Sequence, residues 1–169
     1  MKISILLFLL FFNLQALQTD STLPQLTLTG DEGGRLDGSA FDSDTLRGKV
    51  FVIFYVDPDE KDLNNAFSDA LKAQAFDRST FASVAIINMD ATWLPNFAIA
   101  DSLKNKQEKF PHTLYVKDMG KKGVKTWQVA DDDSDIIITD KQGKVLYVHN
   151  GQIPEADFSD IIQLIKEHL

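Results

Sequence analysis

One unbroken apolar run, Val50 to Val56, limits the possible folds more than any other feature of the chain. It contains branched and aromatic side chains, and it ends at an acidic corner. A run without alternation is typical of a strand buried on both faces, as in a sheet that helices cover. A second run, from Val84 to Met89, has the same character. We therefore expect an α/β fold.

Helical spacing separates the expected strands. Apolar residues recur at the spacing of one helix face from Leu63 to Ala75, between the two apolar runs. Because strands that alternate with helices are joined by right-handed crossovers, the early strands should be parallel. The expected elements, in chain order, are a hairpin of 23–28 with 35–37, a helical turn at 44–46, strand 50–56, helix 63–75, strand 84–89, helix 97–106, strand 113–117, a hairpin of 136–139 with 145–148, and a last helix opened by Pro154.

The first residues carry a targeting signal. Lys2 precedes an apolar run from Ile3 to Phe12, and Ala16 follows soon after it. This is the layout of a secretory signal peptide, and the run is shorter than the roughly 20 residues that span a bilayer. We expect cleavage near Ala16, which removes 1–16 and leaves 17–169 as a single exported domain with no stable membrane span. An uncleaved anchor is the alternative.

Composition excludes several classes of function. The chain has no cysteine, so it can form neither a disulfide, a thiolate nucleophile nor a cysteine metal site. Its formal net charge of −8 opposes non-specific binding to nucleic acid. His112, His149 and His168 lack the spacing of a zinc site. No glycine-rich phosphate loop is present, and we expect no cofactor.

Several segments resemble known proteins. Four stretches resemble the thioredoxin fold of exported thiol-disulfide and peroxiredoxin-like proteins, namely 26–30 with 46–50, 84–90, 110–118 and 136–145. More narrowly, 127–135, 140–144 and 151–169 resemble the YtfJ family of bacterial periplasmic proteins. The resemblance implies a thioredoxin-like three-layer fold, with a mixed central sheet, helices on both faces and an N-terminal β-hairpin extension. It also implies a periplasmic location. The family is poorly characterised, and some of its labels suggest transcription regulation.

The departures from redox-active relatives are informative. In this resemblance, the two cysteines of the Cys-x-x-Cys motif fall at Asp59 and Asp62, and the cis-proline falls at Ser134. Neither aspartate can form a thiolate or a disulfide. A non-proline cis bond is costly, so we expect a trans peptide before Ser134. The resemblance therefore implies the fold without its thiol chemistry, and we expect no enzyme activity of that kind.

Acidic residues gather where the expected strands end, and they are the candidate binding site. Parallel strands end at the same edge of a sheet, and the loop before 136–139 should reach that edge too. Converging carboxylates could bind a divalent cation weakly or a basic protein surface. The alternative is a solvated edge whose carboxylates stabilise helix N-termini, with Asp57 before Pro58 as an N-cap. The candidate residues are Asp57, Asp59, Glu60, Asp90, Asp131, Asp132, Asp133 and Asp135.

Two other groups are weaker candidates. Lysines cluster in the sequence between the second helix and the fourth strand, so the molecule could be dipolar, although charge runs are usually solvated. These lysines are Lys104, Lys106, Lys109, Lys117, Lys121, Lys122 and Lys125. Trp93, Phe97 and Trp127 could line a groove beside the acidic edge, but such aromatics more often belong to a core.

Three functions remain open. The favoured one is an exported, noncatalytic module that binds an envelope protein or a small ligand through the acidic edge. The second is an enzyme of unrecognised, metal-assisted chemistry at the same edge. The third is a DNA-binding regulator, which the signal peptide and the lack of a recognition helix oppose.

Overall fold

The computed structural model describes residues 16–169. The expected signal peptide lies almost wholly outside these residues. Within them, no helix is long and apolar enough to cross a membrane. The strands and helices are β1 Thr27–Leu28, β2 Gly33–Arg35, β3 Phe41–Asp42, β4 Val50–Val56, α1 Asn65–Ala73, β5 Phe81–Asn88, α2 Asn96–Lys109, β6 Thr113–Asp118, α3 Lys122–Trp127, β7 Ser134–Thr139, β8 Val145–His149 and α4 Phe158–His168.

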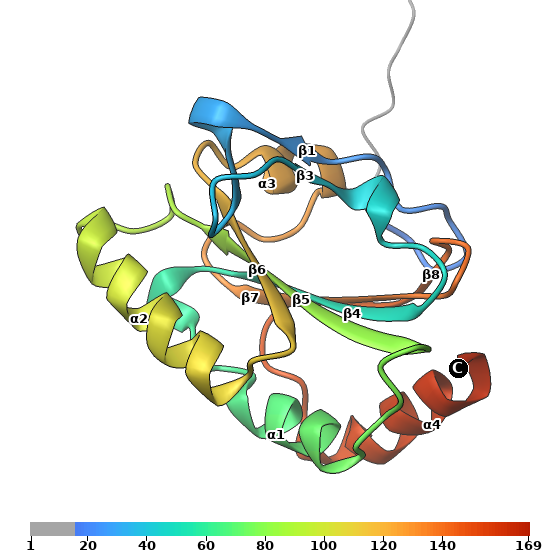
Figure 1. Ribbon diagram of the computed structural model, residues 1–169. Helices are drawn as coiled ribbons and strands as arrows, with labels where there is room; N and C mark the ends of the chain where they lie inside the picture. The colour runs from blue at the N-terminus through green and yellow to red at the C-terminus, as the bar shows by residue number, and fades with distance from the viewer. Residues whose placement is uncertain (1–15) are drawn as a thin grey trace, which may run out of the picture.

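A six-stranded mixed sheet forms the centre of the protein, in the order β2-β6-β5-β4-β7-β8. Strands β4, β5 and β6 are parallel, whereas β2, β7 and β8 run antiparallel to their neighbours. Figure 1 shows α1, α2 and α4 below this sheet, and α3 with β1 and β3 above it. The expected α/β fold with helices on both faces is confirmed.

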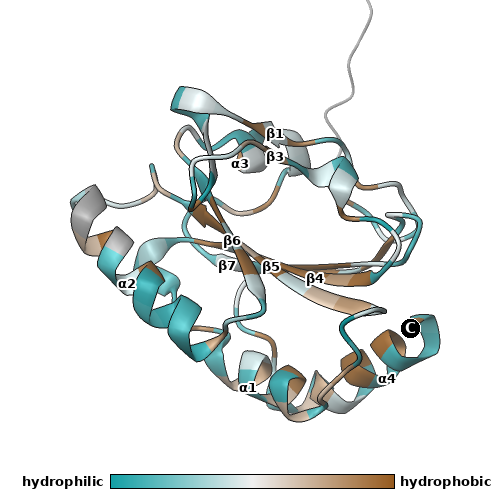
Figure 2. Ribbon diagram, in the orientation of Figure 1, coloured by the Kyte–Doolittle hydropathy of each residue, from teal (hydrophilic) through white to brown (hydrophobic). Residues whose placement is uncertain are grey.

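Alternation along β4 divides the core between the two faces. Phe54 and Val56 pack with the residues of α1, α2 and α4. Ile53 and Tyr55 pack instead with Trp127 of α3 and with the N-terminal strands. Because successive side chains of a strand point to opposite faces, a continuous apolar run is what a sheet covered on both sides requires. Figure 2 shows the mostly apolar strands of the sheet between layers that contain many more hydrophilic residues.

The N-terminal strand pair is present, but its expected partner was wrong. Strand β1 pairs with Phe41–Asp42 in β3, whereas Gly33–Arg35 joins the edge of the main sheet beside β6. Gly33 has a φ of 116°, and a Cβ there would collide with the carbonyl oxygen of Lys117. The glycine therefore allows the close approach that draws this segment to β6 instead of to β1.

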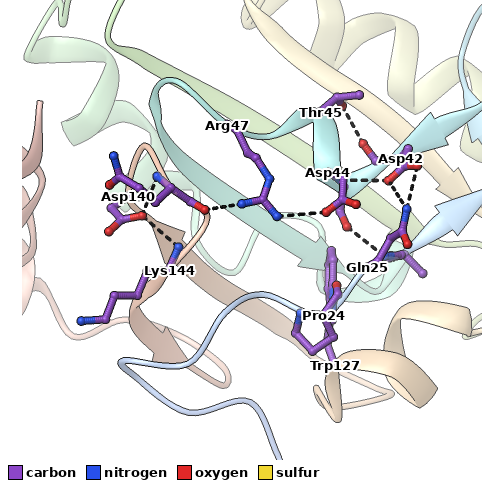
Figure 3. A network of polar contacts seen from close by, with 12 residues as sticks. Pro24, Gln25, Asp42, Asp44, Thr45, Arg47, Trp127, Asp140 and Lys144 are labelled. Carbon is purple, nitrogen blue, oxygen red and sulfur yellow. Dashed lines mark hydrogen bonds and ion pairs between the residues drawn. The ribbon is translucent and has the colours of Figure 1, made fainter.

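The N-terminal extension is fastened to the upper layer by hydrogen bonds (Figure 3). The Trp127 indole N–H donates to the carbonyl oxygen of Pro24 over 2.7 Å. The Gln25 amide donates to the Asp42 carboxylate, and so links the two sides of the β1–β3 pair. Arg47, just before β4, pairs with Asp44 over 3.1 Å and also donates to the carbonyl oxygen of Gln142 in the β7–β8 turn.

The first helix starts later than its apolar spacing predicts. Asp57 caps a 3-10 turn, Pro58–Glu60, and does not cap α1 itself, which begins at Asn65. The short α3 was not predicted. It is flanked by two residues in the left-handed conformation, Lys121 and Gln128, and neither of them is a glycine that would mark the boundary in the sequence.

Candidate functional site

The structure brings together the loops that follow β4 and β5 and the loop that precedes β7. The Asp57 N–H donates to the carbonyl oxygen of Asp133 over 2.9 Å. The Asn88 amide at the end of β5 donates to the carbonyl oxygen of Asp131 over 3.1 Å and to its carboxylate over 3.0 Å. We define this region, with its candidate carboxylates, as the acidic edge.

Asp57 has a structural role within the edge. Its side chain is only 4% exposed, and its carboxylate accepts a hydrogen bond of 2.8 Å from the Asp59 N–H. Burial raises the pKa of Asp57, and the nearby carboxylates of Asp59, Asp132 and Glu60 add to the rise, although the hydrogen bond opposes it. Asp59 and Glu60 are exposed. The 3-10 turn that Asp57 caps therefore exposes the carboxylates of Asp59 and Glu60 to solvent.

Lys121 neutralises part of the edge. Its ammonium lies 2.8 Å from the Asp131 carboxylate, and that contact lowers the pKa of Asp131 and raises the pKa of Lys121. The carboxylates of Asp90 and Asp132 also lie close enough to favour the charged lysine. Both of these aspartates are exposed. The edge thus combines one paired carboxylate with several free to meet solvent or a partner.

Asn64 ties the loops together, and the sequence analysis missed it. Its amide nitrogen donates to the carbonyl oxygens of Ser134, over 3.0 Å, and Gly151, over 3.1 Å. Its amide oxygen accepts from the Ile153 N–H over 3.0 Å. Asn64 is buried one residue before α1. An asparagine at a helix start is a detectable signal, but it predicts a cap and not these long-range bonds.

Ser134, at the position of the lost cis-proline, is shielded from solvent. Ser134 is buried, its N–H bonds to the Asp133 carboxylate over 2.9 Å, and no peptide bond among residues 16–169 is cis. Asp62, at the position of the second cysteine of the lost motif, forms an ion pair with Lys106 over 3.0 Å. That lysine lowers the pKa of Asp62.

Asp135 does not belong to the exposed edge. It is fully buried in β7, and neither of its carboxylate oxygens accepts a hydrogen bond of good geometry among the described residues, although the Ala130 N–H is close enough to oppose the rise in its pKa. Burial raises its pKa to about 7, with a further contribution from Asp133. Asp135 was one of the candidate binding residues, and the structure places it in the interior of the protein, apart from the exposed carboxylates of the acidic edge.

The weaker candidates divide. Five of the clustered lysines form ion pairs within the protein, which balances part of their charge locally: Lys104, Lys106, Lys109, Lys121 and Lys122. Trp127 is buried in the upper layer, and the side chain of Phe97 is outside the described part of the structure. Trp93, three residues after Asp90, is 87% exposed.

In residues 16–169, no group of three or more histidine, aspartate or glutamate side chains could hold a metal ion.

Two relatives match most of the length of this chain. An uncharacterised protein of Haemophilus influenzae is 32% identical over 161 residues, covering 88% of this chain and 85% of the relative. The uncharacterised Escherichia coli protein YtfJ is 21% identical over 161 residues, covering 90% and 87%.

A solved thioredoxin domain shares the fold. It comes from a thiol-disulfide oxidoreductase of Bacteroides vulgatus, with a TM-score of 0.65 and 16% identity, covering 91% of this chain and all of that one. At this identity the likeness shows the fold alone, and the cysteine-free chain cannot carry out dithiol exchange. The sequence model of a bacterial family of unknown function, YtfJ_HI0045, matches residues 28–168. The chain therefore belongs to the YtfJ family and has a thioredoxin-like fold.

Proposed function

We propose that this protein is an exported, noncatalytic binding module of the bacterial envelope, and that the acidic edge is its contact surface. In this proposal residues 1–16 are a cleaved signal peptide, and 17–169 act as one domain in the periplasm. The N-terminal apolar run and the bacterial family support export. The terminal sequence of the purified protein, read by mass spectrometry, tests it. A chain that still begins at Met1 would contradict it.

A single observation supports a contact role most strongly. The loops that carry redox chemistry in other proteins of this fold are firmly connected here, yet they hold no thiol. Hydrogen bonds fix the backbone, while Asp59, Glu60, Asp90 and Asp132 keep exposed side chains. A rigid frame with exposed charges lowers the conformational entropy lost on binding.

Trp93 extends the proposed surface beyond charge. Exposed tryptophan is enriched among the residues that dominate protein interfaces. Trp93 lies in the loop that also carries Asp90, so an aromatic anchor sits next to the carboxylates in the sequence. A partner with a basic patch and an apolar pocket fits this combination, and its capture should weaken as salt is raised.

A pull-down from the envelope of the source bacterium tests the proposal. The edge variant carries Asp59→Asn and Asp132→Asn. The control carries Asp157→Asn and Asp160→Asn, two exposed residues at the start of α4 that change the net charge equally. We expect a partner that the wild type and the control retain and the edge variant loses. Equal capture by both variants, or no capture by the wild type, would contradict the proposal.

A further inference from the structure

A large cavity lies between α1, α2 and the lower face of the sheet. Its volume is about 1080 Å³, which is at the upper end of the roughly 300–1,000 Å³ range of small-molecule sites. Side chains of β4, β5 and β6 form its floor, and α1 and α2 form its walls. It touches the acidic edge only at one end, through Pro58, Asn64 and Ser134.

The interior is apolar. Phe54, Val56 and Ile87 line the floor, and Leu71 and Leu103 line the walls. Its uncharged polar lining consists of separate side chains, namely hydroxyls, the His112 ring and the amides of Asn64 and Asn65, and both amides are already hydrogen-bonded within the protein. A peptide segment would bury N–H and C=O groups that this lining cannot pair. A saturated hydrocarbon chain has no such groups.

The rim is basic, although the chain as a whole carries a net charge of −8. The described lining includes Lys49, Lys61, Lys72, Arg78, Lys106 and Lys109, against one acidic residue, Glu108. Two of these lysines meet at one point. The ammonium groups of Lys72 and Lys109 lie 5.3 Å and 4.9 Å from the centre of the Phe110 ring.

Lys72 is the better anion-binding group of the two. Its ammonium donates to the carbonyl oxygen of Lys109 over 3.2 Å, so the two groups are held near each other across α1 and α2. Lys109 pairs with the half-exposed Asp69 over 3.3 Å. An exposed pair of this kind contributes little and can exchange for another carboxylate.

We propose that the cavity binds a fatty acid of medium chain length, with the acyl chain on the apolar floor and the carboxylate at Lys72 and Lys109. The apolar interior selects the chain, and the basic rim selects the anion. This site is separate from the proposed protein contact, because none of the exposed carboxylates of the acidic edge lines it. Failure of either proposal therefore leaves the other intact.

Calorimetric titration of the purified protein with dodecanoate, below its micelle concentration, tests the proposal. Affinity should rise roughly fourfold for each methylene added from octanoate to dodecanoate, as expected for methylene burial. Dodecanol serves as the probe without a charge. The variant Lys72→Gln with Lys109→Gln should weaken dodecanoate binding by about tenfold and leave dodecanol binding unchanged.

Two further variants keep the test decisive. Ser102→Phe places a ring in the cavity from α2 and should abolish binding of both probes. A cooperative thermal transition of this variant is the control that it is folded. Lys104→Gln with Lys125→Gln changes the charge equally at exposed positions outside the lining, and it should bind like the wild type. No saturable binding by the wild type, or binding that Ser102→Phe retains, would overturn the proposal.

Discussion

The two faces of the central sheet are built from the same strands but are filled differently. On the upper face Trp127 meets Tyr55 edge-on, with ring centres 6.5 Å apart, and the Tyr55 hydroxyl donates to the buried Asp118 over 2.9 Å. On the lower face α1 meets α4 through Phe67 and Phe158, whose ring centres are 5.3 Å apart. Between α1 and α2, however, the connections are lysine contacts, and the cavity lies beneath them.

This difference separates stability from binding within one sheet. Atoms in a closely packed core have dispersion contacts on every side, whereas atoms that line a cavity lack some of them. The upper face should therefore carry more of the folding free energy. In the fatty-acid proposal, the cavity lets the lower face take up a ligand beside its packed core.

The largest expected effect compares adjacent residues of β5 that point to opposite faces. Ile86 is fully buried in the upper core, and Ile87 lines the cavity. Ile86→Ala should lower the free energy of unfolding by about 4 kcal/mol and Ile87→Ala by about 2 kcal/mol, because the second change only enlarges an existing void. Urea denaturation of both variants measures this. Equal losses would remove the distinction between the faces.

An effect of similar size and opposite sign concerns the buried carboxyl of Asp135. Its pKa in the folded protein, about 7, is above the ordinary value of 3.8, so the folded state retains a proton that the unfolded chain releases. Its contribution is therefore most favourable below about pH 4 and is lost as the pH rises towards 7. Asp135→Asn should be more stable than the wild type by about 4 kcal/mol near pH 8 and nearly equal to it near pH 4.

Denaturation curves of the Asp135 pair across this pH range provide the measurement. Asp133 is the neighbouring carboxylate that also raises the pKa of Asp135, so Asp133→Asn serves as a control that should reduce the pH dependence without abolishing it. A stability difference that stays constant with pH would show that Asp135 keeps its ordinary pKa in the folded protein.

The smallest effect again compares the two faces of the sheet, this time with substitutions that add side-chain volume to each face. A Cβ at Gly123 would collide with the Tyr55 ring, which the hydrogen bond to Asp118 holds in place. Gly123→Ala should therefore cost about 2 kcal/mol, whereas Ser102→Phe, which enters the cavity, should change stability by less than about 1 kcal/mol. Melting temperatures of the two variants test this, and a larger loss for Ser102→Phe would mean that the cavity cannot accept added volume.

Much of the fold follows from local pattern. The unbroken run at 50–56 predicts a strand covered on both faces, and the glycine-containing link after Asp140 predicts the last hairpin. The partner of β1 was not predictable, because it depends on where Gly33 allows the chain to approach β6. Such a choice between strands is made by tertiary contacts and not by periodicity.

The site was predictable in its location but not in its details. Strand direction predicts that the loops at Asp57, Asp90 and Asp131 share one edge. It does not show that Lys121 pairs with Asp131, or that Asp135 is buried because β7 is covered on both faces. The cavity was missed entirely, since an apolar stripe on a helix has the same sequence pattern whether its face is filled or hollow.

The most direct test of the acidic edge as a contact surface is site-specific photo-crosslinking in living cells. A photoreactive amino acid is placed at Asp59 or at Trp93, and, for comparison, at Gln163 or Lys166 on the exposed side of α4. Our account predicts cross-links to a discrete envelope protein from the two edge positions and none from α4. Cross-links from α4 alone, or no cross-link from either edge position, would contradict it.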